Sequence, residues 1–485
     1  MSDKSRRRAP PQVPRGTRLV YGFGSVAEGI KNTAFSVFLL FYFSQVLGLP
    51  GTLAGGAIFL ALCVDAVTDP LIGSISDNFV SKIGRRHPFM YAAAIPMPLC
   101  FYWLFNPPAG LGHWGLFAWM AGFAIGVRFS MTLFSIPTAA LIAELTNDYD
   151  ERTTLVSIRS LFGWMGGLGI SQLAYLVFFV PSENFADGLL DPSAYGGFAA
   201  ACAVLIFIAI IVCSVGTHHT IPRLKTQPNP TPFSWAQFVS DVSQVLHNHS
   251  YVNLMIASFF IFVAAGFNDV MGLYVNTYFW EFTTQQLAML VWALFLAPLL
   301  AVSLTPAITR RFDKKRTMIT LAAIAIAVGP LPVIGRLVGV MPENGAPMLL
   351  PLIVAHATVI ITLVVAIGIV YASMIADTVD ENELLNGRRQ EGVFMAAITF
   401  VIKATSGVGG FIAGIALDVI AFPTQAAPGA VPPETLFGLG LVVGPGSTLL
   451  IVVSLFFMAR YRLTRERHTE ILEELETRRQ LAAAD

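Results

Sequence analysis

Two aspartates, Asp65 and Asp69, lie four residues apart inside an apolar segment that is long enough to cross a lipid bilayer. On a helix, residues four apart share one face, so the two carboxylates are neighbours. A carboxylate at membrane depth costs about 2.5–3.5 kcal/mol on insertion scales. A second negative charge on the adjacent turn raises that cost unless a cation or a proton lies between them. The pair therefore predicts a cation site inside a membrane protein.

A simpler interpretation of the aspartates is ion pairing. Three basic side chains, Lys31, Arg128 and Lys403, also lie within apolar segments. Each could neutralise one aspartate, since charged side chains at membrane depth are normally paired. The sequence leaves both interpretations open.

The composition is that of a polytopic membrane protein. The chain has 485 residues, of which 55% are hydrophobic and 12% charged, and its mean hydropathy is +0.67. Average soluble proteins are about 25% charged. The formal net charge of zero gives no reason to expect a nucleic-acid partner. The four cysteines all lie in apolar segments and are interpreted as small apolar residues rather than a disulfide framework or a metal site.

Twelve windows are apolar and long enough to span a membrane. They cover approximately residues 20–47, 51–76, 88–106, 113–144, 153–181, 195–217, 251–280, 286–309, 317–337, 348–376, 391–420 and 437–459. The longest break follows the sixth window and contains several prolines. We therefore expect an all-α membrane protein of twelve transmembrane helices in two six-helix bundles. The expected regions are a tail at 1–18, a bundle at 19–219, a linker at 220–250, a bundle at 251–461 and a tail at 462–485.

Lysine and arginine set the expected orientation. If twelve spans alternate, the loops of one side hold almost all of the loop Lys and Arg residues, and the opposite loops hold only Arg336. Cytoplasmic loops carry such an excess. Both termini and the central linker are therefore expected to be cytoplasmic.

The C-terminal tail alternates acidic and basic residues around Ile471, Leu472 and Leu475 from about 462 to 482. This pattern predicts an amphipathic helix, either solvated near the membrane surface or bound to a partner. No phosphate loop, zinc-ligand spacing or nucleophile elbow is present. An enzyme is therefore not expected, and an ion gradient is the expected source of energy.

Several motifs carry a resemblance to a known family. They are Tyr21-Gly-Phe-Gly24, Asp65-Ala-Val-Thr-Asp-Pro-Leu-Ile-Gly73, Ser76-Asp77 through Gly84-Arg-Arg-His-Pro88, Asp148-Tyr-Asp-Glu-Arg-Thr153, and Ala376-Asp-Thr-Val-Asp-Glu381 through Gly387-Arg-Arg-Gln-Glu-Gly392. From about 19 to 461 the chain resembles the glycoside–pentoside–hexuronide:cation symporters of the major facilitator superfamily.

The resemblance implies two pseudo-symmetric bundles with alternating access to a cavity at the bilayer midplane. It places Na⁺, Li⁺ or H⁺ at Asp65 and Asp69, with Thr132 as a further cation ligand. We also assign Ser135 to the cation site. The resemblance also implies a small-molecule substrate, contact with membrane lipid, a monomer that suffices for transport and residence in the bacterial inner membrane. No cofactor other than the coupling ion is expected.

Three positions depart from the pattern of the family's best-known member, the melibiose permease. Gly29 and Ser135 stand where that protein has aspartates, and Ala139 stands where it has a tryptophan. Carboxylates and flat aromatic faces are what a pyranose binds, so these changes argue against a galactoside. Fewer acids near the cation also leave Na⁺ and H⁺ both open. The small residues are expected to widen the cavity.

A polar set inside the spans is expected to bind substrate. Its members are Glu28, Lys31, Asn32, Arg128, Ser135, Arg159, Asp269 and Lys403. Arg159 and Lys403 enter the set because they match basic residues of the family. Arg128 has two interpretations: it pairs with an acid, or it clamps an anionic substrate. Asn268 and Asn276 extend the stripe around Asp269 and either line the cavity or bond between helices.

Charged residues at the expected cytoplasmic ends are assigned to gating rather than to substrate binding. In the first half they are Asp77, Arg85 and Arg86, together with Lys82. In the second half they are Asp377, Asp380, Arg388, Arg389 and Glu391. The resemblance implies that the first-half loop belongs to charge networks that hold the outward-open state.

Three functions follow from these features. The first is a symporter that couples Na⁺ or H⁺ to a sugar, a glycoside or a hexuronide. The second keeps cation coupling but carries a lysophospholipid or another amphiphilic anion, held by Arg128 or Lys403. The third is a sensor that does not transport and signals through the C-terminal tail.

Overall fold

The computed structural model describes residues 13–146, 148–223, 248–386, 391–461 and 463–484. All regular secondary structure in these ranges is helical, and turns and loops connect the helices. In the first half the helices are α1 (Arg15–Phe23), α2 (Ser25–Thr33), η1 (Ala34–Phe38), α3 (Leu39–Phe41), η2 (Tyr42–Val46), α4 (Gly51–Asn78), α5 (His87–Ala93), α6 (Pro96–Leu104), α7 (His113–Leu145), α8 (Tyr149–Leu173), η3 (Ala174–Phe178), η4 (Gly188–Leu190), α9 (Pro192–His218) and η5 (Ile221–Arg223). In the second half they are α11 (His249–Tyr274), η6 (Val275–Phe279), α12 (Thr284–Arg311), α13 (Lys314–Val328), α14 (Leu331–Leu337), α15 (Leu349–Asn386), α16 (Glu391–Val419), α17 (Pro433–Leu441), η7 (Val442–Gly446), α18 (Ser447–Ala459) and α19 (Arg465–Ala484).

The expected spans correspond to these helices. Among the described residues, nine helices are long and apolar enough to cross a membrane. Of the other three expected spans, the one at 391–420 is α16, and two are interrupted helices. The first, expected at 20–47, begins at Arg15, breaks at Gly24 and contains two π-helical turns. The third, expected as one helix at 88–106, is split into α5 and α6 just before Pro96. Proline lacks an N–H and clashes with the preceding turn, which accounts for that break.

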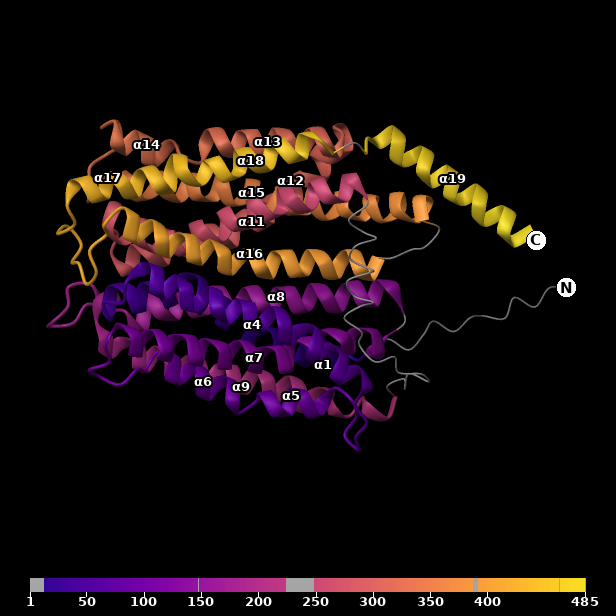
Figure 1. Cartoon of the computed structure of the whole chain (residues 1–485), viewed down its shortest axis with the longest axis horizontal. Helices are drawn as coiled ribbons and strands as arrows, with labels where there is room; N and C mark the ends of the chain where they lie inside the picture. Colours follow the sequence, from indigo (N-terminus) through magenta and orange to yellow (C-terminus); the bar gives the residue numbers. More distant parts are fainter. Residues whose placement is uncertain (1–12, 147, 224–247, 387–390, 462, 485) are drawn as a thin grey trace.

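The helices form two bundles that lie side by side (Figure 1). The first-half helices, indigo to magenta, make up one bundle, and the second-half helices, orange to yellow, make up the other. We call the end where α1 begins and α19 lies the terminal end, and the opposite end the far end. Of the expected regions, 1–12 and 224–247 lie outside the described residues.

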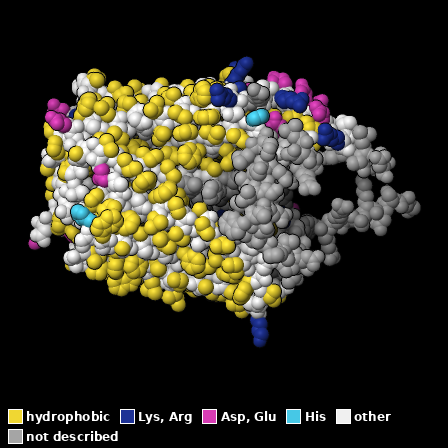
Figure 2. Space-filling model, viewed as in Figure 1, with side chains coloured by type: hydrophobic (Ala, Val, Ile, Leu, Met, Phe, Trp, Pro, Cys, Tyr) yellow, Lys and Arg dark blue, Asp and Glu magenta, His cyan; other side chains and the backbone are white. Residues whose placement is uncertain are grey.

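The flank of the molecule is apolar. Figure 2 shows hydrophobic side chains over most of the described flank, with charged side chains gathered mainly at its ends. Large apolar side chains such as Trp292, Leu299 and Phe456 are more than half exposed. Such a surface suits a lipid solvent, because helices satisfy their own backbone polar groups.

Hydrogen bonds between the two halves hold the far end together. Both oxygens of Asp418, at the end of α16, accept backbone N–H groups at the start of α4, from Gly51 at 2.9 Å and from Thr52 at 2.7 Å. These amides have no acceptor within their own helix, and a carboxylate complements the helix dipole. Tyr278 also donates to Gln45 at 3.1 Å.

Glycines bring α4 and α16 into backbone contact next to this cap. A Cβ added at Gly414 would lie 2.2 Å from the Gly51 carbonyl oxygen, and one at Gly55 would lie 3.0 Å from the Phe411 Cα. Small residues spaced four apart allow such close helix packing in membranes. Phe59 stacks on Phe411 one turn further along, with ring centroids 5.4 Å apart. The contact between the halves therefore runs from the far end toward the middle of α4.

We expect Gly414→Ala to destabilise the protein by about 1–3 kcal/mol, because the added methyl group overpacks a backbone contact. The measurement is the melting temperature of the purified protein. Gly368→Ala is the matched control, since a Cβ at that position meets nothing within 4 Å. Equal melting temperatures for the two variants would contradict this account of the interface.

Candidate functional site

The two aspartates meet one hydroxyl group in the middle of the first half. Thr132 of α7 lies 3.0 Å from Oδ1 of Asp65 and 2.8 Å from Oδ1 of Asp69. A threonine hydroxyl has one proton, so it donates to one carboxylate at a time and presents lone pairs to the other. A positive charge nearby relieves the repulsion between the two carboxylates. The arrangement therefore suits a bound cation or a proton.

Arg128 lies one turn before Thr132 on α7 and contacts the same aspartate. Its Nη1 donates to Oδ2 of Asp65 at 3.0 Å, and each of these side chains is only 9% exposed. The guanidinium carbon lies 5.5 Å from the centroid of the Phe35 ring. Of the two interpretations of Arg128, the structure shows the ion pair with an acid.

A cavity of about 470 Å³ opens beside this cluster. It is lined by most of the residues expected to bind cation or substrate: Glu28, Lys31, Asn32, Asp65, Arg128, Thr132, Ser135, Arg159 and Asp269. Asp69 is not in the lining and lies behind the Thr132 hydroxyl. The side chain of Lys403 lies outside the described residues. Residues far apart in the sequence, and from both halves, therefore share one polar cavity.

A second cavity, of about 670 Å³, shares five lining residues with the first and continues along α2 and α8. Glu28 of α2 and Arg159 of α8 form an ion pair at 2.7 Å on the wall common to both cavities. Asp269 of α11 is the second half's carboxylate on that wall, and its side chain is exposed to the cavity. The walls thus offer donors and acceptors to a polar ligand.

Trp164 of α8 was missed by the sequence analysis. It lines the larger cavity, is 50% exposed and lies on the helix that carries Arg159. Its ring places a flat aromatic face on the cavity wall, on a different helix from Ala139. The nearby glycines Gly163 and Gly167 pack against α2. In the sequence, Gly163 and Gly167 lie four residues apart, a spacing typical of helix packing. This spacing was the one signal that the neighbouring Trp164 lies close to another helix.

Gly29 does not widen the cavity as expected. A Cβ at this position would lie 2.0 Å from the Gly163 carbonyl oxygen. The absent side chain is therefore replaced by the backbone of α8. Gly29 is a helix-packing residue, and the expectation of extra room at this position was wrong.

The charged residues of the first half at the terminal end form one cluster. Arg85 and Arg86 both contact Glu144 of α7, at 2.6 and 3.1 Å, and Arg86 also pairs with Asp77. Glu144 was not identified from the sequence, because its partners lie almost sixty residues away. These ion pairs all join residues of the same half.

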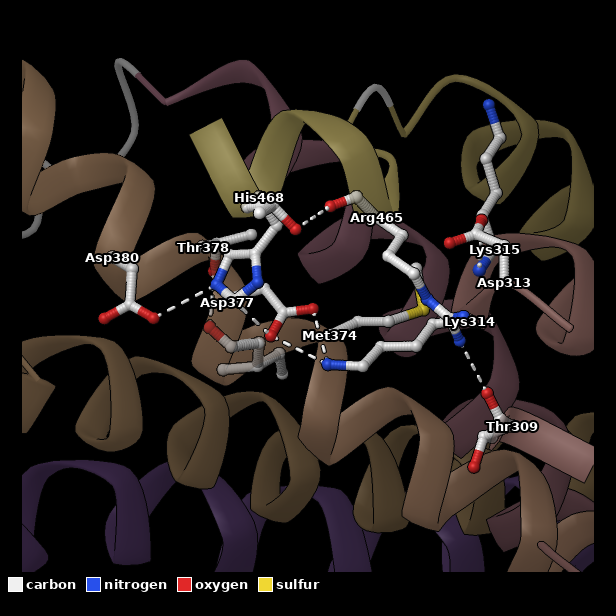
Figure 3. A network of polar contacts seen from close by, with 12 residues as sticks. Thr309, Asp313, Lys314, Lys315, Met374, Asp377, Thr378, Asp380, Arg465 and His468 are labelled. Carbon is white, nitrogen blue, oxygen red and sulfur yellow. Dashed lines mark hydrogen bonds and ion pairs between the residues drawn. The ribbon is translucent and has the colours of Figure 1, made fainter. Parts of the chain in front are cut away.

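The second half carries a matching cluster at the same end (Figure 3). Lys314 contacts Asp377 at 2.7 Å, and His468 of α19 lies 3.2 Å from Asp380 and 3.7 Å from Asp377. Arg465 donates to the Thr309 carbonyl at 2.9 Å. Arg388, Arg389 and the side chain of Glu391 lie outside the described residues.

The predicted tail helix exists as α19, but it is not simply solvated. Ile471 and Leu475 are buried in a cluster that includes Val379 and Leu384 of α15, whereas Leu472 is exposed. The apolar side of α19 therefore binds the second half of its own chain. Beside it, burial first and the Asp377 carboxylate second raise the pKa of Tyr461, so its hydroxyl stays protonated; it lies 3.4 Å from the Met374 carbonyl oxygen.

The family described as MFS/sugar transport protein matches residues 20–465. An uncharacterized symporter of Synechocystis is 27% identical and is covered over 97% of its length by 96% of this chain. The isoprimeverose transporter of Lactiplantibacillus pentosus is 26% identical, with 84% of this chain and 80% of that protein covered. A putative 2,3-dihydroxypropane-1-sulfonate exporter of Salmonella typhimurium is 26% identical, with 99% of each covered.

Solved transporters share the fold. The nucleoside transporter NupG, as its D323A mutant, superposes with a TM-score of 0.64 at 14% identity, covering 92% of this chain and 99% of that one. The xylose transporter XylE of E. coli gives 0.59 at 16% identity, covering 94% and 98%.

We expect Glu28 and Arg159 to be energetically coupled. Glu28→Gln or Arg159→Gln leaves one charge without its partner on a wall where each side chain is only about a fifth exposed. In a double-mutant cycle of thermal stability, the coupling should be about 0.5–3 kcal/mol. The half-exposed pair Arg467–Glu470 serves as the control and should show no measurable coupling. Additive effects at Glu28 and Arg159 would refute the coupling.

Proposed function

This chain is a multi-pass membrane protein of the MFS/sugar transport family, and from that premise we propose that it couples Na⁺ or H⁺ to the uptake of a sugar, a glycoside or a hexuronide. The observation that carries the proposal is the Thr132 hydroxyl between two carboxylates. Three oxygen-bearing side chains from two helices converge there, and two neighbouring carboxylates favour a cation or a proton between them. The proposed location is the bacterial inner membrane, with a monomer as the working unit.

The proposed mechanism uses the cation to organise the first half. A cation at Asp65 and Asp69 screens their repulsion and tightens the contact between α4 and α7. Those helices also form part of the cavity wall, so substrate affinity rises when the cation is bound. Linkage requires that the substrate raise cation affinity by the same factor. This reciprocal gain is what couples the two solutes.

Alternating access fits the contacts at the two ends. The halves are joined at the far end by Asp418 and the glycine interface. The named ion pairs at the terminal end each stay within one half. With the basic terminal end placed in the cytoplasm, we assign this conformation to the inward-facing side of the cycle.

The cavity walls support a sugar-like substrate. The Glu28–Arg159 pair and Asp269 present acceptors and donors for hydroxyl groups, and Trp164 presents an aromatic face for a C–H surface. A similar protein is named as an isoprimeverose transporter, which agrees with this chemistry.

A second substrate class is an amphiphilic anion such as a lysophospholipid. Arg128 and Arg159 both line the cavity, and a similar protein is named as a putative exporter of a sulfonate. The backbone packing at Gly29 speaks against a cavity enlarged on that side for an acyl chain. We therefore rank this class second.

Asp65→Asn and Asp69→Asn are each expected to lower cation-dependent uptake about tenfold or more, because the site loses a carboxylate on which the coupling rests. Uptake is measured in proteoliposomes under separate Na⁺ and H⁺ gradients. Glu473→Gln, on the exposed side of α19, is the control and should keep native uptake. Unchanged uptake, with unchanged Na⁺ and pH responses in both aspartate variants, would refute the proposal.

The substrate class is tested by thermal-shift measurements with glycosides, uronides and lysolipids. We expect a glycoside or a uronide to stabilise the native protein, because ligand binding to the folded state raises its melting temperature. Arg159→Gln should weaken that stabilisation. Stabilisation by lysolipids alone would reverse the ranking of the two substrate classes.

A further inference from the structure

Arg128 and Thr132 of α7 face Asp65 and Asp69 of α4 with matching spacing. Each pair is four residues apart, so each helix presents one face to the other. Both oxygens of Asp65 are engaged, Oδ2 by the Arg128 guanidinium and Oδ1 by the Thr132 hydroxyl, each at 3.0 Å. The guanidinium therefore stands where an external cation would have to bind Asp65.

The ion pair between Asp65 and Arg128 affects how a Na⁺ ion could bind at this position. Arg128 already balances the charge of Asp65. A Na⁺ ion bridging both carboxylates would lie close to the guanidinium, and like charges a few ångströms apart in a buried site repel strongly. Arg128 and a bridging Na⁺ therefore compete for Asp65.

The Arg128 guanidinium is held mainly by its ion pair, because not all of its N–H groups are hydrogen-bonded. Its Nε is buried and has no hydrogen-bond partner in the described part of the chain. An unpaired buried donor costs free energy, and it persists here because the ion pair with Asp65 and the Phe35 ring hold the head group in place. Arginine does not lose its proton, so its charge is permanent.

We propose that Arg128 is a tethered cation: it occupies the Asp65 half of the ion site, so the native protein responds weakly to Na⁺, and removal of the arginine charge creates a strong Na⁺ response. The inference rests on the proposed ion site at Asp65 and Asp69 and makes Arg128 its selectivity-determining residue. Arg128 thereby sets which ion the carrier uses, whatever organic substrate occupies the cavity.

The test is a Na⁺ titration of the purified full-length chain, with choline chloride replacing NaCl at constant ionic strength. The readout is the melting temperature, which does not depend on transport. Arg128→Gln should respond at a Na⁺ concentration at least about tenfold lower than the native protein, because the site gains one net negative charge. Arg128→Lys keeps the charge and should respond less than Arg128→Gln. Adding Asp65→Asn to Arg128→Gln should remove the gained response.

Two results would overturn the inference. One is an Arg128→Gln variant no more sensitive to Na⁺ than the native protein. The other is a native protein that already saturates with Na⁺ and loses that response in Arg128→Gln. If Arg128→Gln does not fold, Arg128→Met takes its place in both comparisons. Failure of the proposed function is separate, since it would appear as unchanged uptake in the Asp65 and Asp69 variants.

Discussion

Two negative charges on adjacent turns of a buried helix are the constraint around which the first half is arranged. The carboxylates of Asp65 and Asp69 share one threonine proton, and one of them also holds an arginine. Water cannot solvate them fully at that depth, so α7 has to supply both a hydroxyl and a positive charge at matching heights. The two helices that hold these charges also supply part of the cavity wall. In the proposed function, the ion and substrate sites are adjacent because this helix pair contributes to both.

The two ends of the molecule are stabilised by different interactions. At the far end the halves meet through glycine backbones and a helix cap, contacts that are short-ranged and are lost as soon as the halves separate. At the terminal end each half has its own ion-pair cluster, which need not break during such a movement. α19 extends the cluster of the second half, because its buried face and His468 bind that half. The second half and its tail therefore behave as one unit.

Much of this arrangement follows from the sequence, and the rest depends on distant partners. Hydropathy located the spans, and the cost of buried charge singled out Asp65, Asp69 and Arg128. The role of Gly29 was misjudged because a glycine in a helix fits both a wide cavity and a tight packing contact. Trp164 and Glu144 were missed because a single side chain carries no sign of which distant helix it will face. The burial of Ile471 and Leu475 against α15 was likewise invisible to periodicity, which gives the apolar side of a helix but not its partner.

The cap at Asp418 has a consequence for the opposite conformation. The first amides of α4 have their acceptors on the other bundle, so the start of this helix is completed only while the bundles touch at the far end. When they part, those amides turn to water, and the first turn of α4 loses a cap worth about 0.5–2 kcal/mol. The same helix carries Asp65 and Asp69 further along. In the proposed transport cycle, opening of the far end would therefore combine partial fraying of the start of α4 with a movement of rigid bodies.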